Sequence, residues 1–186
     1  MLFGLLALPI SYEYYAPYRT RPYLPPYPSF VIAGVIEGIA VNVIDGDTIT
    51  VLDSNKVQHR VRIAGIDAPE KNQPFGNASR KRLGESVARK EVRVEFEKHD
   101  RYGRIDGKVL VNPPDCPTCG KTLDVGLAQI TTGMSWWYRK YAREQSPEDQ
   151  GRHEFAEQEA RAKNIGLWRD TNSTPPWEFR AVQRGR

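Results

Sequence analysis

Residues 59–70, HRVRIAGIDAPE, combine the pattern of a buried strand with charged side chains. The apolar residues of this stretch alternate with other residues as they do in a buried β-strand. A cation, Arg62, nevertheless stands within this strand, and two carboxylates, Asp67 and Glu70, follow it on either side of a proline. A strand does not need these charges in order to fold, so we expect them to serve a site at the strand's end.

The segments on both sides of this stretch predict further short strands and a few helices. Residues 35–70 indicate three strands, because turn-forming residues at 45–46 and 53–55 divide them. Two more strands are predicted, one over residues 91–98, which alternate strictly, and a short one over residues 108–111. Apolar spacing and start and stop residues predict helices over residues 77–90, 123–133 and 147–164.

This order of elements predicts an α+β fold with a mainly β core. We expect a five-stranded barrel of the OB type with about three helices packed against it. The barrel domain would span residues 35–170, with a C-terminal tail at 171–186. Residues 1–34 hold six of the nine tyrosines and begin with ten apolar residues. They are interpreted either as the remnant of a secretory signal, although no Lys or Arg precedes the apolar run, or as a flexible arm.

The composition is that of a soluble globular protein. Hydrophobic residues make up 39% of the chain and charged residues 27%, and no apolar run is long enough to predict a membrane span. The net charge of +4 permits a polyanionic partner but does not require one.

Three polar clusters lie where the predicted strands end. Alone, each has an ordinary explanation, as an Asp–Gly turn, a surface arginine or a solvated loop. Together they offer aspartates that suit a hard cation, a further carboxylate that can accept a proton from water, and arginines that can clamp a phosphate. The set therefore predicts metal-assisted hydrolysis of a phosphodiester. The clusters are Asp45 with Asp47; Arg62 with Asp67 and Glu70; and Asp100, Arg101, Tyr102 and Arg104.

These clusters resemble the motifs of the staphylococcal nuclease (thermonuclease) family in their order and spacing. The resemblance implies an OB-fold barrel and Ca²⁺-dependent cleavage of DNA and RNA that leaves 3′-phosphate ends. It covers about residues 36–169. The motifs that carry it are VIDGDT (43–48), VRIAGIDAPE (61–70) and DRYGR (100–104), followed by GMSWWYRKY (133–141) and EFAEQEARAKNIGLW (154–168).

The resemblance assigns roles to four residues at the proposed metal. Asp47 and Asp67 would bind the cation, and Ala68 would add a backbone carbonyl ligand. The family's namesake has a threonine at the position of Ala68, but a carbonyl ligand does not need the hydroxyl group. Glu70 would act as the general base or would orient the attacking water.

The resemblance also assigns the residues that bind the nucleic acid. Arg62 and Arg104 would hold the scissile phosphate. Arg101 and Tyr102 match positions that contact a terminal phosphate of a bound nucleotide.

The aromatic segment at residues 136–141 has two interpretations. Tyr138 and Tyr141 would stack on a base, because stacking tolerates any sequence. Alternatively, Trp136 and Trp137 are packing residues and only one tyrosine is exposed.

The cysteines and histidines carry no clear catalytic signal. Cys116 and Cys119 would form a local disulfide if the protein is exported, or half of a zinc site completed by a histidine. The three histidines lack ligand spacing and are predicted to be surface residues.

The sequence therefore predicts a Ca²⁺-dependent, thermonuclease-like nuclease that acts on DNA and RNA, with single strands favoured, and that is a monomer without stable membrane insertion. Export to the periplasm or the medium is expected, with a cytoplasmic location as the alternative. Two other functions stay open: a non-catalytic nucleic-acid-binding module on the same barrel, and a structural cell-surface protein that acts through its Tyr/Pro-rich arm.

Overall fold

A computed structural model describes residues 34–185 of the chain. The predicted arm lies outside the described residues except for Gly34. The strands are β1 (Gly34–Val43), β2 (Thr48–Asp53), β3 (Gln58–Ile63), β4 (Ile66–Asp67), β5 (Glu91–His99), β6 (Ile105–Val111), β7 (Leu123–Asp124) and β8 (Trp136–Trp137). The helices are α1 (Gly76–Val87), α2 (Val125–Thr131), α3 (Pro147–Ala162) and α4 (Pro176–Arg184), with 3₁₀ segments η1 (Arg139–Glu144) and η2 (Gly166–Arg169).

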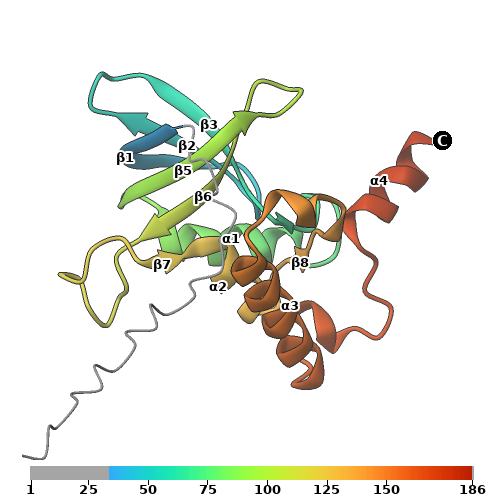
Figure 1. The fold of residues 1–186 in the computed structure, drawn as a ribbon. Helices are drawn as coiled ribbons and strands as arrows, with labels where there is room; N and C mark the ends of the chain where they lie inside the picture. The colour runs from blue at the N-terminus through green and yellow to red at the C-terminus, as the bar shows by residue number, and fades with distance from the viewer. Residues whose placement is uncertain (1–33, 186) are drawn as a thin grey trace, which may run out of the picture.

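Five strands close into the barrel that the sequence predicts. β1 pairs antiparallel with β2 and β5, β2 with β3, and β5 with β6, and the ring closes because β3 and β6 pair in parallel. The register shifts between Ala40 and Asn42, which is a bulge of the kind that bends a strand around a barrel. Figure 1 shows the strands as one curved layer, with the helices gathered on one side of it.

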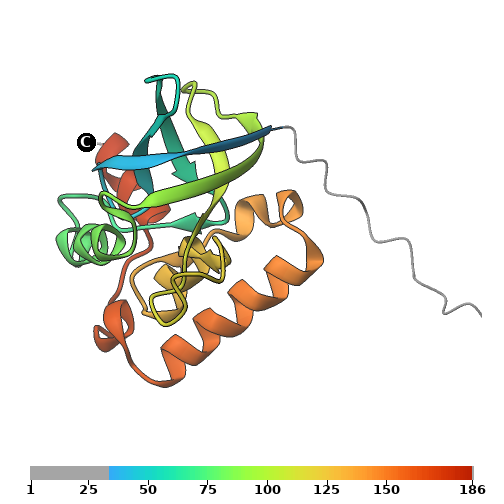
Figure 2. The same cartoon turned by 90° about the vertical axis from the view of Figure 1, so that its left-hand side faces the viewer.

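The helices pack against the barrel, and their buried residues join the barrel core. Leu83 and Val87 lie on one face of α1 and are fully buried, as their spacing predicts. α3 begins at the predicted cap, where the hydroxyl of Ser146 accepts a hydrogen bond from the backbone N–H of Asp149. Figure 2 shows α3 running beneath the barrel. The core joins strand residues to helix residues, including Ile49, Val61, Ile63, Leu83, Val94, Val109 and Ile130.

The C-terminal tail contains a helix that the sequence reasoning missed. α4 has a proline at its start and Glu178 in its first turn, both of which favour a helix N-terminus. Figure 1 shows α4 standing beside the other helices and carrying the C-terminus.

Two other sequence expectations can be compared with the structure. Cys116 and Cys119 are joined in a disulfide, in the loop between β6 and β7. Within residues 34–185, no helix is both long enough and apolar enough to cross a bilayer.

Candidate active site

Asp47 lies in the tight connection between β1 and β2, where the fold holds it firmly. Its side chain is almost buried, and its carboxylate accepts hydrogen bonds from the hydroxyl of Thr48 at 2.8 Å and from the backbone N–H of Ala68 at 3.1 Å. The preceding Gly46 packs so closely that a Cβ there would lie 2.7 Å from the Cβ of Ala68. The loops that carry Asp47 and Ala68 are therefore locked together.

Arg62 and Asp67 meet Asp47 at the end of the barrel. Arg62 lies on β3 opposite Thr48, and Asp67 ends β4, which pairs with β8. One guanidinium nitrogen of Arg62, Nη2, lies 3.3 Å from Oδ1 of Asp67 and 3.5 Å from Oδ2 of Asp47. A single nitrogen thus faces both aspartates, so the two carboxylates converge on one region.

Burial and crowding of negative charge dominate the electrostatics here. Burial raises the pKa of Asp67, and burial together with the nearby Asp47 raises the pKa of Asp45 to about 6. Burial lowers the pKa of Arg62, but the carboxylates of Asp47 and Asp67 outweigh it and hold that pKa above its ordinary value. The site therefore has an excess of carboxylates that favours binding of a cation.

Glu70 lies on the loop between β4 and α1. The backbone N–H of Glu70 donates to the side-chain oxygen of Gln73, and the backbone N–H of Gln73 donates to the carbonyl of Glu70. This small turn presents the carboxylate of Glu70 to the same cleft as Asp67. There it accepts a 2.7 Å hydrogen bond from Arg180 of α4.

Arg104 enters from the hairpin between β5 and β6. Its Nε donates to Oδ2 of Asp100 at 2.7 Å, and its guanidinium lies 5.5 Å from the ring centre of Tyr102. The guanidinium of Arg101 lies 4.8 Å from the same ring, which is 68% exposed. Burial raises the pKa of Asp100, but hydrogen bonds from the backbone and side chain of Arg104 outweigh it and lower that pKa. The motif thus forms a compact basic and aromatic hairpin.

Tyr138 follows β8 and lies between two aromatic rings. Its ring stacks on Trp177 of α4 with centres 5.4 Å apart, and meets the edge of Tyr141. Trp136 and Trp137 are buried, so the packing interpretation of these two residues is confirmed. One face of Tyr138 is therefore covered by α4.

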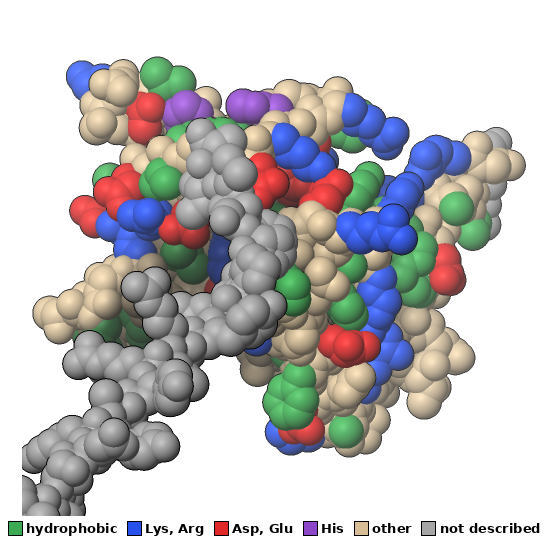
Figure 3. All heavy atoms as spheres, viewed as in Figure 1, with side chains coloured by type: hydrophobic (Ala, Val, Ile, Leu, Met, Phe, Trp, Pro, Cys, Tyr) green, Lys and Arg blue, Asp and Glu red, His purple; other side chains and the backbone are tan. Residues whose placement is uncertain are grey.

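The structure brings all the predicted site residues into one cleft of about 770 Å³. Lys and Arg side chains gather on the side of the molecule that carries α4 (Figure 3). The predicted residues that line the cleft are Asp47, Arg62, Asp67, Ala68, Glu70, Arg101, Tyr102, Arg104 and Tyr138.

The family described as staphylococcal nuclease homologue matches residues 60–170. The chain belongs to the staphylococcal nuclease family. As a member of this family it is a nuclease, a hydrolase whose substrates are nucleic acids.

The chain is similar to curated relatives over most of their length. The chain is 41% identical over 151 residues to "Protein ParB" of Escherichia coli, which covers 81% of the chain and 82% of the relative. It is 41% identical over 149 residues to "Micrococcal nuclease" of Shigella flexneri, with 79% and 82% covered. An "Uncharacterized endonuclease" of Escherichia coli is 37% identical over 150 residues, with 81% and 88% covered.

The donors in this nuclease fit a hard cation that takes most of its ligands from solvent and substrate. Asp47 and Asp67 supply carboxylate oxygens, and the backbone of Ala68 lies between Asp67 and Glu70. Within residues 34–185, no group of three or more His, Cys, Asp or Glu side chains is arranged to hold a metal. The protein ligands alone would therefore be few, as befits a site that must also admit a phosphate and water.

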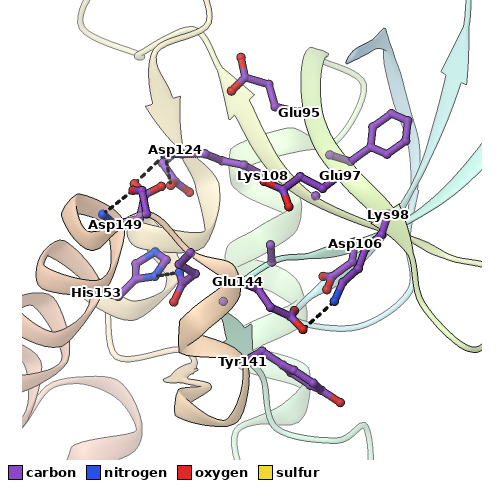
Figure 4. Close-up of a pocket in the computed structure, with 16 residues that line it drawn as sticks. Glu95, Glu97, Lys98, Asp106, Lys108, Asp124, Tyr141, Glu144, Asp149 and His153 are labelled. Carbon is purple, nitrogen blue, oxygen red and sulfur yellow. Dashed lines mark hydrogen bonds and ion pairs between the residues drawn. The ribbon is translucent and has the colours of Figure 1, made fainter. Parts of the chain in front are cut away.

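A second cavity of this nuclease, about 220 Å³, lies between the barrel and α3. Figure 4 shows Lys108 directed toward Asp124 and Asp149, and Nζ of Lys108 lies 2.7 Å from Oδ1 of Asp149. His153 lies beside this network and is only 3% exposed, so its predicted surface position is wrong. His153 is buried because it lies on the side of α3 that faces the barrel.

The sequence analysis did not predict Arg180, which lies in the same cleft of this nuclease and contacts Asp67. The α4 arginine donates from Nη2 to Oδ2 of Asp67 at 2.6 Å and from Nη1 to Oδ1 at 3.1 Å. A signal was present, because Pro175 and Pro176 followed by Glu178 are typical of a helix start. Nothing in the local sequence, however, indicates which distant carboxylates the helix would contact.

Proposed function

We propose that this nuclease depends on Ca²⁺, hydrolyses phosphodiester bonds of DNA and RNA, and leaves 3′-phosphate ends. The proposal rests on the composition of the cleft. Two converging aspartates, a third carboxylate and two arginines line it; they are Asp47, Asp67, Glu70, Arg62 and Arg104. Residues of these types match the needs of metal-assisted phosphodiester hydrolysis.

The arginines would bind and polarise the phosphate. Among residues 34–185, only Nη2 of Arg62 makes hydrogen bonds, so its other N–H groups remain available to phosphate oxygens. Arg104 would approach from the opposite hairpin, held there by Asp100. Planar guanidinium groups donate two parallel hydrogen bonds, and they stabilise the negative charge on the phosphate oxygens in the transition state.

The carboxylates would divide between the cation and the water. Asp47, Asp67 and the carbonyl of Ala68 would hold Ca²⁺, which would supply Lewis-acid stabilisation of the phosphate's negative charge. Glu70 would accept a proton from the attacking water, because its side chain, which is 40% exposed, is more open to water than those of Asp47 and Asp67.

The substrate would be bound preferentially as a single strand. Tyr102 is exposed on its hairpin, and Tyr138 and Tyr141 also line the cleft. Aromatic side chains stack on bases only when those bases are unpaired or splayed out, and such stacking tolerates any sequence. We further propose that the protein is exported, because a disulfide such as Cys116–Cys119 persists in oxidising compartments. We also propose that it acts as a monomer.

The test is digestion of single- and double-stranded DNA and RNA with Ca²⁺ and with excess chelator, followed by analysis of the product ends. We expect cleavage only with the cation, faster on single strands, with 3′-phosphate products. Equal cleavage in chelator would refute the cation requirement, and 5′-phosphate products would refute the assigned bond. Binding of nucleic acid without cleavage under any condition would instead favour the non-catalytic module.

A further inference from the structure

Arg180 of α4 connects two carboxylates that the proposed reaction uses in different ways. Its Nη2 lies 2.6 Å from Oδ2 of Asp67, and its Nη1 lies 3.1 Å from Oδ1 of Asp67 and 2.7 Å from Oε1 of Glu70. The planar guanidinium therefore spans both side chains at once. A lysine, with its single nitrogen, does not provide this fork.

Glu70 depends on this contact for a defined position. Its side chain is 40% exposed, and within residues 34–185 its carboxylate has Arg180 as its sole hydrogen-bond and ion-pair partner. The carboxylate of Asp67, by contrast, is 1% exposed and also contacts Arg62. Without Arg180, the glutamate would be free to sample solvent-directed rotamers, and it would spend less time directed at Asp67.

Other contacts hold α4 in place without the help of Arg180. Trp177 stacks on Tyr138 with an interplanar angle of 25°, and Pro176 is buried at the start of the helix. The side-chain amide of Gln73 donates a hydrogen bond to the carbonyl of Thr174. Since Gln73 also bonds the backbone of Glu70, the loop of the glutamate and the segment before α4 form one unit.

We propose that Arg180 is a positioning residue of the nuclease and that α4 is part of its active site. Arg180 fixes the carboxylate of Glu70 relative to Asp67, so that the proton acceptor and the cation ligand keep the spacing that the attacking water requires. This inference rests on the proposed function and assigns to it a residue outside the family's matched segment, which ends at residue 170.

The same contact allows an opposite role, in which the guanidinium competes with a cation for Asp67. The two roles predict different effects of Arg180 on turnover and on cation binding. A positioning residue supports turnover when the cation is saturating, whereas a competitor weakens cation binding and does not help turnover.

The first experiment compares Arg180→Ala and Arg180→Lys with the wild type on a short single-stranded DNA at saturating Ca²⁺. We expect Arg180→Ala to lower kcat by about 10- to 100-fold, the usual cost of removing a residue that orients a metal-site group, with KM within a few-fold. Arg180→Lys should recover only part of the loss. Arg152→Ala is the matched control, because this arginine lies on α3 and pairs with Glu148, so it removes one positive charge away from the cleft.

A double-mutant cycle with Glu70→Gln tests whether Arg180 acts through the glutamate. If it does, adding Arg180→Ala to Glu70→Gln should change kcat by less than about threefold, because the group that Arg180 orients is already disabled. Fully additive losses would overturn the proposal. Thermal unfolding of each variant confirms that the comparison is made between folded proteins.

Calorimetric titration with Ca²⁺ supplies a readout that does not depend on turnover. We expect the Ca²⁺ affinity of Arg180→Ala to stay within a few-fold of the wild type. Tighter Ca²⁺ binding together with an undiminished or higher kcat would overturn positioning in favour of competition. A wild type that is inactive with every divalent cation would refute the proposed function and this inference with it. An active wild type matched by an equally active Arg180→Ala would refute this inference alone.

Discussion

Glu70 is the residue for which a catalytic and a structural role are hardest to separate, because it pairs with an arginine and also faces the cleft. If it accepts the proton from the attacking water, Glu70→Gln should lower kcat by about 10²- to 10⁴-fold. The affinities for Ca²⁺ and for a nucleotide should change little. Steady-state kinetics with calorimetric binding measures both. A loss of binding and stability in parallel with turnover would show that Glu70 only braces its loop.

At the residue scale, contacts made by neighbouring segments were predictable and distant ones were not. Asp47, Arg62 and Asp67 lie on adjoining strands and loops, so their motif spacing already indicated that they converge. Arg180, by contrast, pairs with Asp67, which lies 113 residues away in the sequence. Only the docking of α4 brings that pair together, and docking depends on side-chain packing that no local pattern encodes.

At the scale of elements, α3 carries a buried histidine whose charge state should affect stability. Burial lowers the pKa of His153, although Asp124 and Asp149 oppose this effect, while Lys108 and Arg152 reinforce it. Its Nδ1 is engaged by the side-chain amide of Gln145, and its buried Nε2 has no partner within the described residues. This environment suits a neutral ring.

Stability should consequently fall as the pH drops below the ordinary histidine pKa of about 6.5. The unfolded chain binds the proton there while the folded state still resists it, so the loss accumulates until the lower folded pKa is reached. Between pH 7.5 and 5.5, we expect the wild type to lose up to about 1 kcal/mol more unfolding free energy than His153→Gln. Urea unfolding at both pH values measures this. Parallel pH dependence in the two proteins would mean that His153 protonates equally in both states.

The sequence predicted the long strands better than it predicted the short strands and the C-terminal helix. The barrel strands were predictable from alternation and turn residues, but β6 begins at Ile105, earlier than expected, because pairing with β3 and β5 extends it. β4 and β8 are two-residue strands that exist only through their mutual pairing. α4 was missed because its proline-rich start resembles a loop when the partner surface is unknown.

At the scale of the whole molecule, the cleft residues all lie within the barrel domain and α4. None of the predicted site residues falls in residues 1–33, which the structure does not describe. We therefore expect deletion of residues 1–33 to leave turnover on a short single-stranded substrate within a few-fold of the full chain. Matched kinetics of the two proteins measures it. A collapse of kcat in a folded, truncated protein would show that this segment completes the site.

We expect hydrolysis to depend on a cation held by the converging aspartates, and a variant of Asp67 tests this dependence. Asp67→Asn keeps the shape of the side chain but removes its charge, so it should weaken Ca²⁺ binding while the fold is retained. The measurement is the initial rate of single-stranded DNA cleavage as a function of Ca²⁺ concentration for the wild type and this variant. We predict a saturable rise for the wild type and, for Asp67→Asn, a rate at least about 10²-fold lower at every concentration that saturates the wild type. A variant curve that overlays the wild-type curve, or full wild-type activity in excess chelator, would show that hydrolysis does not depend on a cation bound by Asp67.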